Sequence, residues 1–293
     1  MNILVAFNDA YAMPARVMLT SLIENNHCAL DIYILYIALS DESIRSMRTL
    51  DNDRVTLKFI QMDDGFLDII PVTNHFSKDA YIRLFAHLYL PECVDKILWL
   101  DSDLIINGSI CEYYDQSFDG KLFIADKDMD FWDNTEKKKE LGMPSEAVYI
   151  NSGVLLMNLK EIRNRIQKED IIEYIRENYN KIEYVDQDVF NGLMFKDFKV
   201  VDPESKYNYF TRRITPWNKK QVYQEVRVLH YLGGEKPWKK GYKFYGFKIW
   251  WRYALQADKN YKELYKNIYF SCWKAIAIRF LRQQIKRYYQ IFK

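Results

Sequence analysis

The sequence predicts an α/β protein with a single mixed, mostly parallel sheet flanked by helices, as in Rossmann-like folds, and a C-terminal helical extension. Two observations indicate this class. Short apolar runs alternate with helix-like stretches along the chain, and polar residues stand where several of these runs end. The 293 residues fit one large or two small domains. We expect a main domain over residues 1–265 and a basic tail over residues 266–293.

The first hundred residues are expected to form four strands and three helices. Short, continuous apolar runs predict buried strands: residues 2–7, 31–38, 55–60 and 96–100. Helices are expected between these strands, each with a capping or terminating signal: Pro14 in the first turn of 14–25, Ser40 before a helix through 50, and Ser77 before 78–90 with Pro91 after it.

Later segments continue the same alternation. Residues 121–125 and 148–156 are expected to form strands, and residues 159–179 a long charged helix. Between the two strands, residues 126–147 are polar and rich in Lys and Glu, which predicts a loop over a site. Ligands of such sheets bind beyond the carboxyl ends of the strands, where Asn8, Asp9 and Asp101 would lie.

Composition excludes several classes of protein. Hydrophobic residues make up 49% of the chain and charged residues 28%, which excludes a disordered chain. The apolar runs are too short to span a bilayer, and the first residues lack the basic stretch of a secretory signal. Four widely spaced cysteines favour neither a zinc site nor a disulfide scaffold. We therefore expect a cytoplasmic globular protein.

The sequence contains no glycine-rich phosphate-binding turn, so a bound nucleotide would need another partner for its phosphates. A cation held by carboxylates is the obvious substitute. The pattern Asp-x-Asp occurs five times, and only Asp101-Ser102-Asp103 follows a predicted strand directly and precedes a second apolar run. Two carboxylates packed between apolar runs are costly to bury without a cation, which favours a metal site over a solvated turn.

Two further patterns carry polar groups of interest. Asp186 and Asp188 open a helix-like segment, where carboxylates serve equally well as helix caps or as functional groups. His230 ends a predicted strand over residues 226–229 and precedes Gly233, Gly234 and Lys236, a Gly-Gly pair that allows close backbone approach and a Lys suited to phosphate. One imidazole with two carboxylates suits Mn²⁺, with Mg²⁺ as an alternative.

Taken together, the ordered motifs resemble the family 8 retaining glycosyltransferases, which include bacterial lipopolysaccharide galactosyl- and glucosyltransferases and glycogenin. The resemblance runs from Met1 to about Trp238. It is carried by six blocks in order: residues 8–11 after the opening strand, Tyr81-Ile82-Arg83-Leu84, residues 96–103, residues 151–159, Asp186-Gln187-Asp188 and residues 230–238. The family often has Asp at the position of Asn8 and Asn at the position of Ala10.

This resemblance implies a GT-A fold and transfer of glucose or galactose from UDP-glucose or UDP-galactose to a glycan or glycolipid hydroxyl, as in lipopolysaccharide or cell-surface polysaccharide synthesis. The roles it implies fall into four groups. Asp101, Asp103 and His230 would bind the metal. The donor nucleotide would meet Ala6, Asn8, Tyr11, Arg83, Ser102, Gly233 and Lys236. The hexose would lie among Asp128, Asn151, Asp186, Gln187 and Asp188. His75 falls on the acceptor side.

The mechanism and the function class each leave alternatives. Gln187 would stabilise an oxocarbenium-like sugar during attack from the leaving-group face, or Asp186 or Asp188 would form a covalent intermediate. A manganese-dependent nucleotidyltransferase and a non-catalytic, membrane-associated sugar-nucleotide-binding protein are the other candidates. An aspartyl phosphatase expects Thr or Val where this chain has Ile105.

The last 28 residues carry seven basic and no acidic side chains, whereas the other 265 carry 35 basic and 40 acidic ones. Apolar residues recur there at helical spacing, with Arg and Lys opposite them, a pattern typical of helices on anionic membranes. The alternative is a helix whose apolar side packs on the body. Nucleic acid is not expected, because no recognised binding module accompanies the charge. We expect residues 270–293 to hold the protein at the inner face of the plasma membrane.

Overall fold

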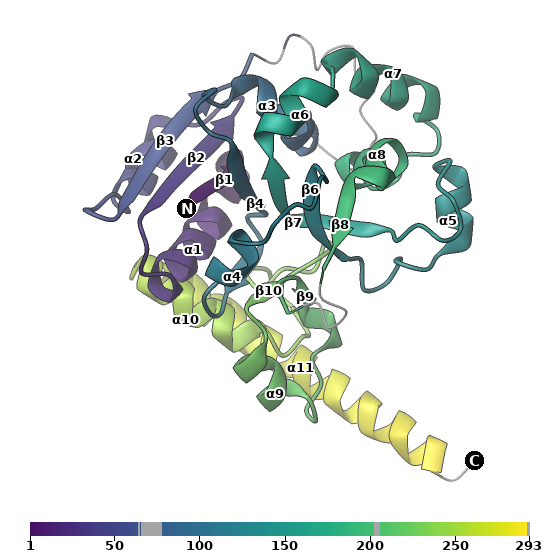
Figure 1. Ribbon diagram of the computed structural model, residues 1–293. Helices are drawn as coiled ribbons and strands as arrows, with labels where there is room; N and C mark the ends of the chain where they lie inside the picture. Colours follow the sequence, from purple (N-terminus) through teal and green to yellow (C-terminus); the bar gives the residue numbers. More distant parts are fainter. Residues whose placement is uncertain (64, 66–77, 202–205, 292–293) are drawn as a thin grey trace.

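The computed structural model describes residues 1–63, 65, 78–201 and 206–291 (Figure 1). Its main sheet has seven strands in the order β3-β2-β1-β4-β7-β6-β8. The β7 strand runs antiparallel to both its neighbours, and the other neighbouring pairs are parallel. This confirms the mixed, mostly parallel sheet. The strands are β1 (Asn2–Ala6), β2 (Leu30–Tyr36), β3 (Val55–Gln61), β4 (Lys96–Leu100), β6 (Phe123–Lys127), β7 (Ile150–Asn158) and β8 (Phe198–Val200).

Helices cover both faces of this sheet, so alternate residues of each strand enter different cores. In β1, Ile3 and Val5 pack toward α1 (Asp9–Asn25), α2 (Asp41–Arg48) and α4 (Cys111–Tyr114). Leu4 packs toward the opposite core. The helices on that side are α3 (Ile82–Tyr89), which follows the 3-10 turn η2 (Lys78–Tyr81), α6 (Leu159–Arg165), α7 (Lys168–Asn178) and α8 (Val185–Met194). Burial on two faces explains why the strands read as continuous apolar runs.

A second, three-stranded sheet brings distant segments to the end of β4. It has the order β5-β10-β9, made from β5 (Leu104–Ile106), β10 (Val228–His230) and β9 (Tyr209–Phe210). The β10 strand is antiparallel to β5, with His230 paired to Leu104. A residue from the last quarter of the chain therefore stands beside the residues that follow β4.

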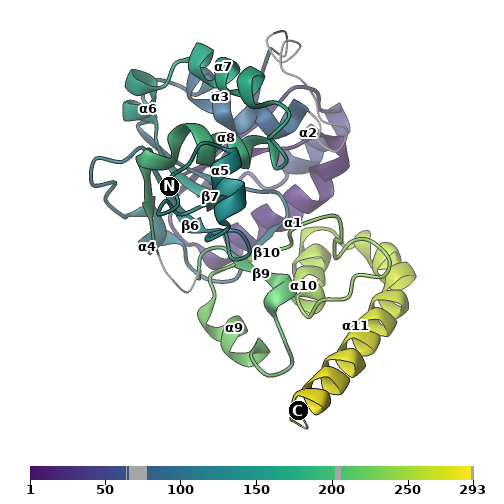
Figure 2. The ribbon, with the colours of Figure 1, turned by 90° about the vertical axis from the view of Figure 1, so that its right-hand side faces the viewer.

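The C-terminal helices extend this second sheet into a third core. Two helices, α10 (Phe247–Ala257) and α11 (Tyr261–Ile291), pack there, and Ile268, Cys272 and Ile276 of α11 are buried. Most side chains from Ala277 to Lys286 are exposed, and Figure 1 shows the yellow end of α11 projecting from the body. Figure 2 shows α11 from another side. The helix runs without a break through the expected division between residues 265 and 266.

Three expected boundaries were wrong. The first helix begins at Asp9 rather than Pro14, so the proline lies inside it. Residues 159–179 form two helices, because Gln167 and Asp170 make a capping box that starts α7 anew. Residues 126–147 are no continuous loop, since they contain the end of β6 and the helix α5 (Thr135–Glu140), capped by Asn134. Ser77 lies outside the described residues.

The remaining elements are short: η3 (Phe195–Asp197), η4 (Thr211–Arg213) and α9 (Lys219–Glu225). Within the described part of the chain, every helix is too short or too polar to cross a bilayer.

Candidate active site

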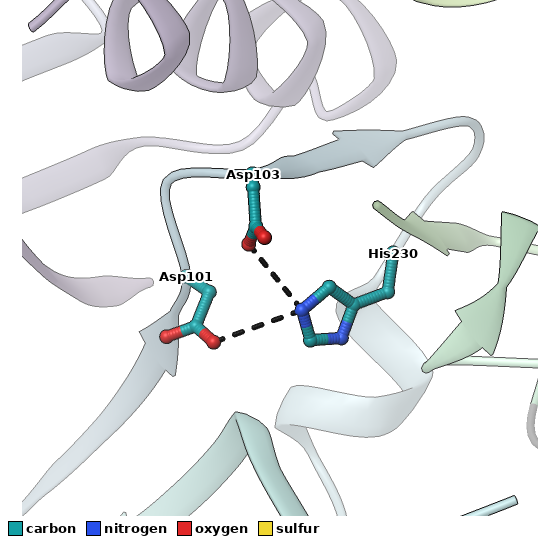
Figure 3. Close-up of side chains that lie close together, drawn as sticks. All are labelled: Asp101, Asp103 and His230. Atoms are coloured by element: carbon teal, nitrogen blue, oxygen red, sulfur yellow. Dashed lines mark ion pairs between the residues drawn. The ribbon is translucent and has the colours of Figure 1, made fainter. Parts of the chain in front are cut away.

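Two carboxylates stand at the carboxyl end of β4. Asp101 and Asp103 flank Ser102 in the short turn between β4 and β5. The backbone N–H of Asp101 donates to the carbonyl of Gly153 at 2.9 Å, which ties the turn to β7. The chain turns sharply over these few residues, and both carboxylates point toward the ring of His230 (Figure 3).

His230 completes a group of three potential metal ligands. Its Nε2 lies 3.3 Å from Asp103 Oδ1 and 3.7 Å from Asp101 Oδ2. One ligand atom from each of the three residues lies within 4.8 Å of the other two. Figure 3 shows the ring turned toward both carboxylates. The sequence therefore predicted a grouping that the fold brings together.

Two features of the surroundings favour a cation between Asp101, Asp103 and His230. The buried Nε2 of His230 has no hydrogen-bond partner among the described residues, as expected of a nitrogen kept for a metal. The space beside it is preserved by Gly153, where a Cβ atom would lie 2.3 Å from His230 Cε1 and 2.9 Å from Asp101 Oδ2. The donor set of two carboxylates and an imidazole suits a divalent cation of intermediate hardness.

Cationic side chains approach the same carboxylates from both sides. Lys236 is buried and its Nζ lies 2.5 Å from Asp103 Oδ2. Arg83 makes an ion pair of 2.6 Å with Asp101 and stacks over the ring of Trp99 at 4.3 Å. Burial alone would raise the pKa of Asp103, but Lys236 and His230 lower it far below its ordinary range. The carboxylate is therefore ionised at neutral pH.

Asp186, in the first turn of α8, is joined to this group through Arg83, which pairs with both Asp101 and Asp186. Its Oδ2 accepts a hydrogen bond of 2.9 Å from the Ser152 hydroxyl and pairs with Arg83 Nε at 3.1 Å. Burial raises the pKa of Asp186 to about 6, and Arg83 opposes that rise. This carboxyl therefore titrates closer to neutrality than an ordinary aspartate.

Gln187 is held by a network of amides and one carboxylate. Its Oε1 accepts from Asn151 Nδ2 at 2.9 Å and from the backbone N–H of Ser152 at 3.2 Å. Its Nε2 donates to Asp128 Oδ2 at 3.3 Å and to the Tyr149 hydroxyl at 3.2 Å. The backbone donor fixes which end of the amide is the oxygen, so the orientation of Gln187 is set by the fold.

Asp188 points away from the cleft and is fully buried. Its oxygens accept from the Tyr149 hydroxyl at 2.6 Å and from the backbone N–H groups of Glu183 and Tyr184 at 2.7 and 2.9 Å, and Lys137 pairs with it at 2.9 Å. The next residue, Val185, has a φ of 41°, a strained value for a β-branched side chain. Asp188 thus stabilises the strained turn around Val185.

Most of the predicted residues line one cleft of about 560 Å³. The predicted residues in its wall are Ala6, Asn8, Tyr11, Arg83, Asp101, Ser102, Asp103, Asp186, Gln187, His230, Gly233 and Lys236. Gly233 has a φ of 80°, which explains a glycine there. Asp128 and Asn151 stand behind Gln187 rather than in the wall, and Asp188 is one layer deeper. His75 lies outside the described residues.

Sequence reasoning missed several contributors to this site. Trp99 donates from Nε1 to Asp101 Oδ1 at 2.9 Å, and Ser152 and Tyr184 line the cleft. Ser152 could have been found from its place between Asn151 and Gly153 in one of the ordered blocks. Asn208, which contacts His230, had no such signal, because it stands outside all six blocks.

Comparison with known proteins identifies the family of the chain. A family model described as glycosyl transferase family 8 matches residues 2–241. The chain belongs to glycosyltransferase family 8. It is accordingly an enzyme, a glycosyltransferase, as the six blocks predicted.

Relatives and solved structures of this family cover most of the chain. The lipopolysaccharide 1,2-glucosyltransferase of Escherichia coli K12 is 28% identical over 82% of this chain and 73% of its own length. The lipopolysaccharide 1,3-galactosyltransferase of Salmonella typhimurium is 27% identical over 66% of this chain and 58% of its own length. A crystal structure of the galactosyltransferase LgtC, with donor and acceptor sugar analogues, has a TM-score of 0.78 and 23% identity over 90% of this chain and 100% of that one. The LgtC comparison confirms the GT-A fold with its C-terminal helix.

Proposed function

We propose that this glycosyltransferase transfers glucose or galactose from a UDP-sugar to a hydroxyl of a glycan or glycolipid, with retention of the anomeric configuration, in lipopolysaccharide or cell-surface polysaccharide synthesis. The observation that carries the proposal is the convergence of Asp101, Asp103 and His230 in a cleft that also holds Lys236 and Arg83. The printed names of the relatives, glucosyl- and galactosyltransferases of lipopolysaccharide, support the substrate class.

The donor nucleotide would enter from the carboxyl end of β1. Ala6, Asn8 and Tyr11 line that end of the cleft and would meet the uracil and ribose. Tyr11 is 38% exposed and its ring is nearly perpendicular to that of Trp238, 6.1 Å away, so it offers aromatic surface to a base. Gly233 allows the backbone to approach the diphosphate closely, and Lys236 contributes charge there.

Asp101, Asp103 and His230 would hold a divalent cation, Mn²⁺ by preference and Mg²⁺ as an alternative. A bound cation of this kind supplies Lewis-acid stabilisation of the negative charge on a leaving diphosphate. Lys236 and Arg83 would add to that stabilisation from the protein side. Both are already fixed by ion pairs, so they need no rearrangement as charge develops.

On the sugar side, Gln187 and Asp186 are the groups in the cleft wall. A carbonyl oxygen such as Gln187 Oε1 would stabilise the oxocarbenium character of the sugar, while the acceptor hydroxyl attacks from the leaving-group face. Asn151, Ser152 and Asp128 hold this amide in place. The full burial of Asp188 among four partners argues against it as a nucleophile. Asp186 remains the alternative for a covalent route.

Hydrolysis of the donor without acceptor tests this proposal. We expect Mn²⁺-dependent release of UDP from UDP-glucose or UDP-galactose, and loss of that release in Asp103→Asn. Release of pyrophosphate from UTP and a sugar 1-phosphate would instead indicate the nucleotidyltransferase. Tight donor binding without turnover, in the presence of a glycan acceptor mixture, would indicate the non-catalytic binding protein.

We further propose that residues 1–265 form the transferase unit and that residues 270–293 hold it at the inner face of the plasma membrane. One side of α11 packs on the body, whereas Phe270, Leu281 and Ile285 on the other side are 80%, 59% and 56% exposed. Exposed apolar groups beside Arg282 and Lys286 suit an anionic lipid surface.

The double substitution Leu281→Glu with Ile285→Glu tests the membrane contact and leaves the docked side of α11 intact. We expect the wild-type chain to co-sediment with vesicles that contain anionic lipid and the variant to stay in the supernatant. Equal sedimentation of both chains would contradict the proposal. Unchanged UDP release in the variant serves as the folding control.

A further inference from the structure

A buried asparagine, Asn208, contacts the ring of His230 from behind. The His230 ring has two nitrogens, and Nε2 faces Asp101 and Asp103. The other, Nδ1, lies 2.8 Å from Asn208 Oδ1. Asn208 is completely buried and directly precedes β9, which pairs with β10 next to His230. The contact is therefore built into the second sheet.

Which end of the Asn208 amide faces the ring follows from its neighbours. The backbone N–H of Gly153 donates to Asn151 Oδ1 at 3.0 Å, so that atom must be an oxygen. Asn208 lies 2.8 Å from the same oxygen and must present its Nδ2 there as a donor. Its Oδ1 consequently faces His230, and His230 Nδ1 must carry a proton. In the neutral ring, the lone pair then belongs to Nε2, the nitrogen that faces the carboxylates.

The same asparagine reaches the opposite wall of the cleft. Asn151, which accepts from Asn208 with its oxygen, donates with its Nδ2 to Gln187 Oε1 at 2.9 Å and to Asp128 Oδ2 at 3.0 Å. One hydrogen-bonded series thus runs from His230 through Asn208 and Asn151 to Gln187. Every amide in it has one orientation only, because backbone N–H groups of Gly153 and Ser152 fix its polarity.

We propose that Asn208 is a positioning residue that sets the His230 tautomer for cation binding and, through Asn151, the orientation of Gln187. This inference rests on the proposed function, since it assumes that the three-residue group holds a divalent cation. Hydrogen-bond partners behind a metal-ligating histidine fix its tautomer and ring orientation, and their loss typically weakens metal affinity by roughly 10- to 100-fold.

The experiment measures Mn²⁺ affinity by the electron paramagnetic resonance signal of free Mn²⁺, in the presence of saturating UDP. Asn208→Ala removes both contacts, and we expect Mn²⁺ affinity to fall about 10- to 100-fold. Asn208→Asp keeps an oxygen toward His230 but sets a second oxygen against Asn151. We expect it to lose much less Mn²⁺ affinity than Asn208→Ala does, with a clear loss of UDP release at saturating Mn²⁺. This split between affinity and turnover is not expected of a residue that only stabilises the fold.

Asn26→Ala is the matched control. Asn26 is also a buried asparagine. Its side chain donates to Leu22 O and accepts from Ile110 N and Cys111 Sγ, and none of these described partners belongs to the cleft wall. We expect it to lower the thermal unfolding temperature without changing Mn²⁺ affinity. Wild-type affinity in Asn208→Ala, or an equal loss in Asn26→Ala, would overturn the role of Asn208 while leaving the proposed function intact.

Should Asn208→Ala not fold, Asn208→Asp decides alone, and wild-type turnover in that variant would overturn the inference. Failure of the wild-type chain itself to bind Mn²⁺ and to release UDP with either Mn²⁺ or Mg²⁺ would overturn the proposed function instead. The two failures are therefore distinguishable.

Discussion

The same short pattern, Asp-x-Asp, occurs on both sides of the cleft with different results. At residues 101 and 103 it spans the turn between two strands, and both carboxylates face His230. At residues 186 and 188 it lies in the first turn of α8, where residues two apart point to different sides. Asp186 therefore enters the cleft and Asp188 enters the core.

The two environments have opposite electrostatic consequences. Lysine and histidine beside Asp103 keep its pKa well below the ordinary range, despite burial. Burial raises the pKa of Asp186 to about 6, although Arg83 is in contact with it. A motif therefore identifies carboxylates, but the local backbone decides whether they act together or separately.

The largest effect is expected from Asp188→Ala. The substitution leaves Lys137, which is only 6% exposed, without its buried partner and releases the turn around Val185. Breaking a buried ion pair on one side costs about 3 to 5 kcal/mol of the free energy of unfolding. Urea denaturation measures it. A loss of UDP release at unchanged stability would show that Asp188 belongs to the chemistry and would remove the contrast between its role and that of Asp186.

Asp103→Asn is expected to lower activity rather than stability. It removes one anionic ligand and the partner of Lys236, so Mn²⁺-dependent UDP release should fall at least about 100-fold, as for loss of a strong electrostatic contact in other active sites. Steady-state kinetics across Mn²⁺ concentrations measure the loss. Full activity of this variant would exclude the three-residue group as the metal site.

Two glycines sharpen the comparison, because each lies beside one motif. A Cβ at Gly153 would press on His230, whereas a Cβ at Gly192 would lie 1.6 Å from the Tyr174 hydroxyl in the core beneath α8. We expect Gly153→Ala to weaken Mn²⁺ affinity, and Gly192→Ala to cost about 1 to 3 kcal/mol of stability by overpacking. Both quantities are measured in both variants. Equal losses of Mn²⁺ affinity and of stability in the two variants would contradict a metal-binding role on one side of the cleft and a structural role on the other.

The smallest expected effect is the change of unfolding free energy with pH that Asp186 causes. The pKa of Asp186 is raised in the folded state, so the folded chain binds this proton more tightly than the unfolded chain does. Its contribution to stability is therefore lost as pH rises toward 6. Relative to Asp186→Asn, the wild-type chain should lose about 1 kcal/mol of unfolding free energy between pH 5 and pH 7. Denaturation of both chains at the two values measures the difference, and parallel curves would contradict it.

The fold and the pair Asp101 and Asp103 were predictable from local signals, and His230 was added to them through the ordered blocks of the family resemblance. Apolar runs identify the strands, and Asp101 follows one of them directly. The contrast within Asp186-Gln187-Asp188 was not predictable, since it depends on how α8 is rotated against the sheet. Asn208 was not predicted from the sequence for a related reason. A buried amide acts through partners far away in the chain, and no periodicity or spacing reports such contacts.

The pairing of β10 with β5 joins residues more than a hundred positions apart. Chains emerge from the ribosome at about 5 to 20 residues per second, and N-terminal segments fold first. The nascent protein consequently holds both aspartates for some seconds before the imidazole arrives. The proposed metal site is thus completed late in biosynthesis, and translation products that end before His230 lack its third ligand.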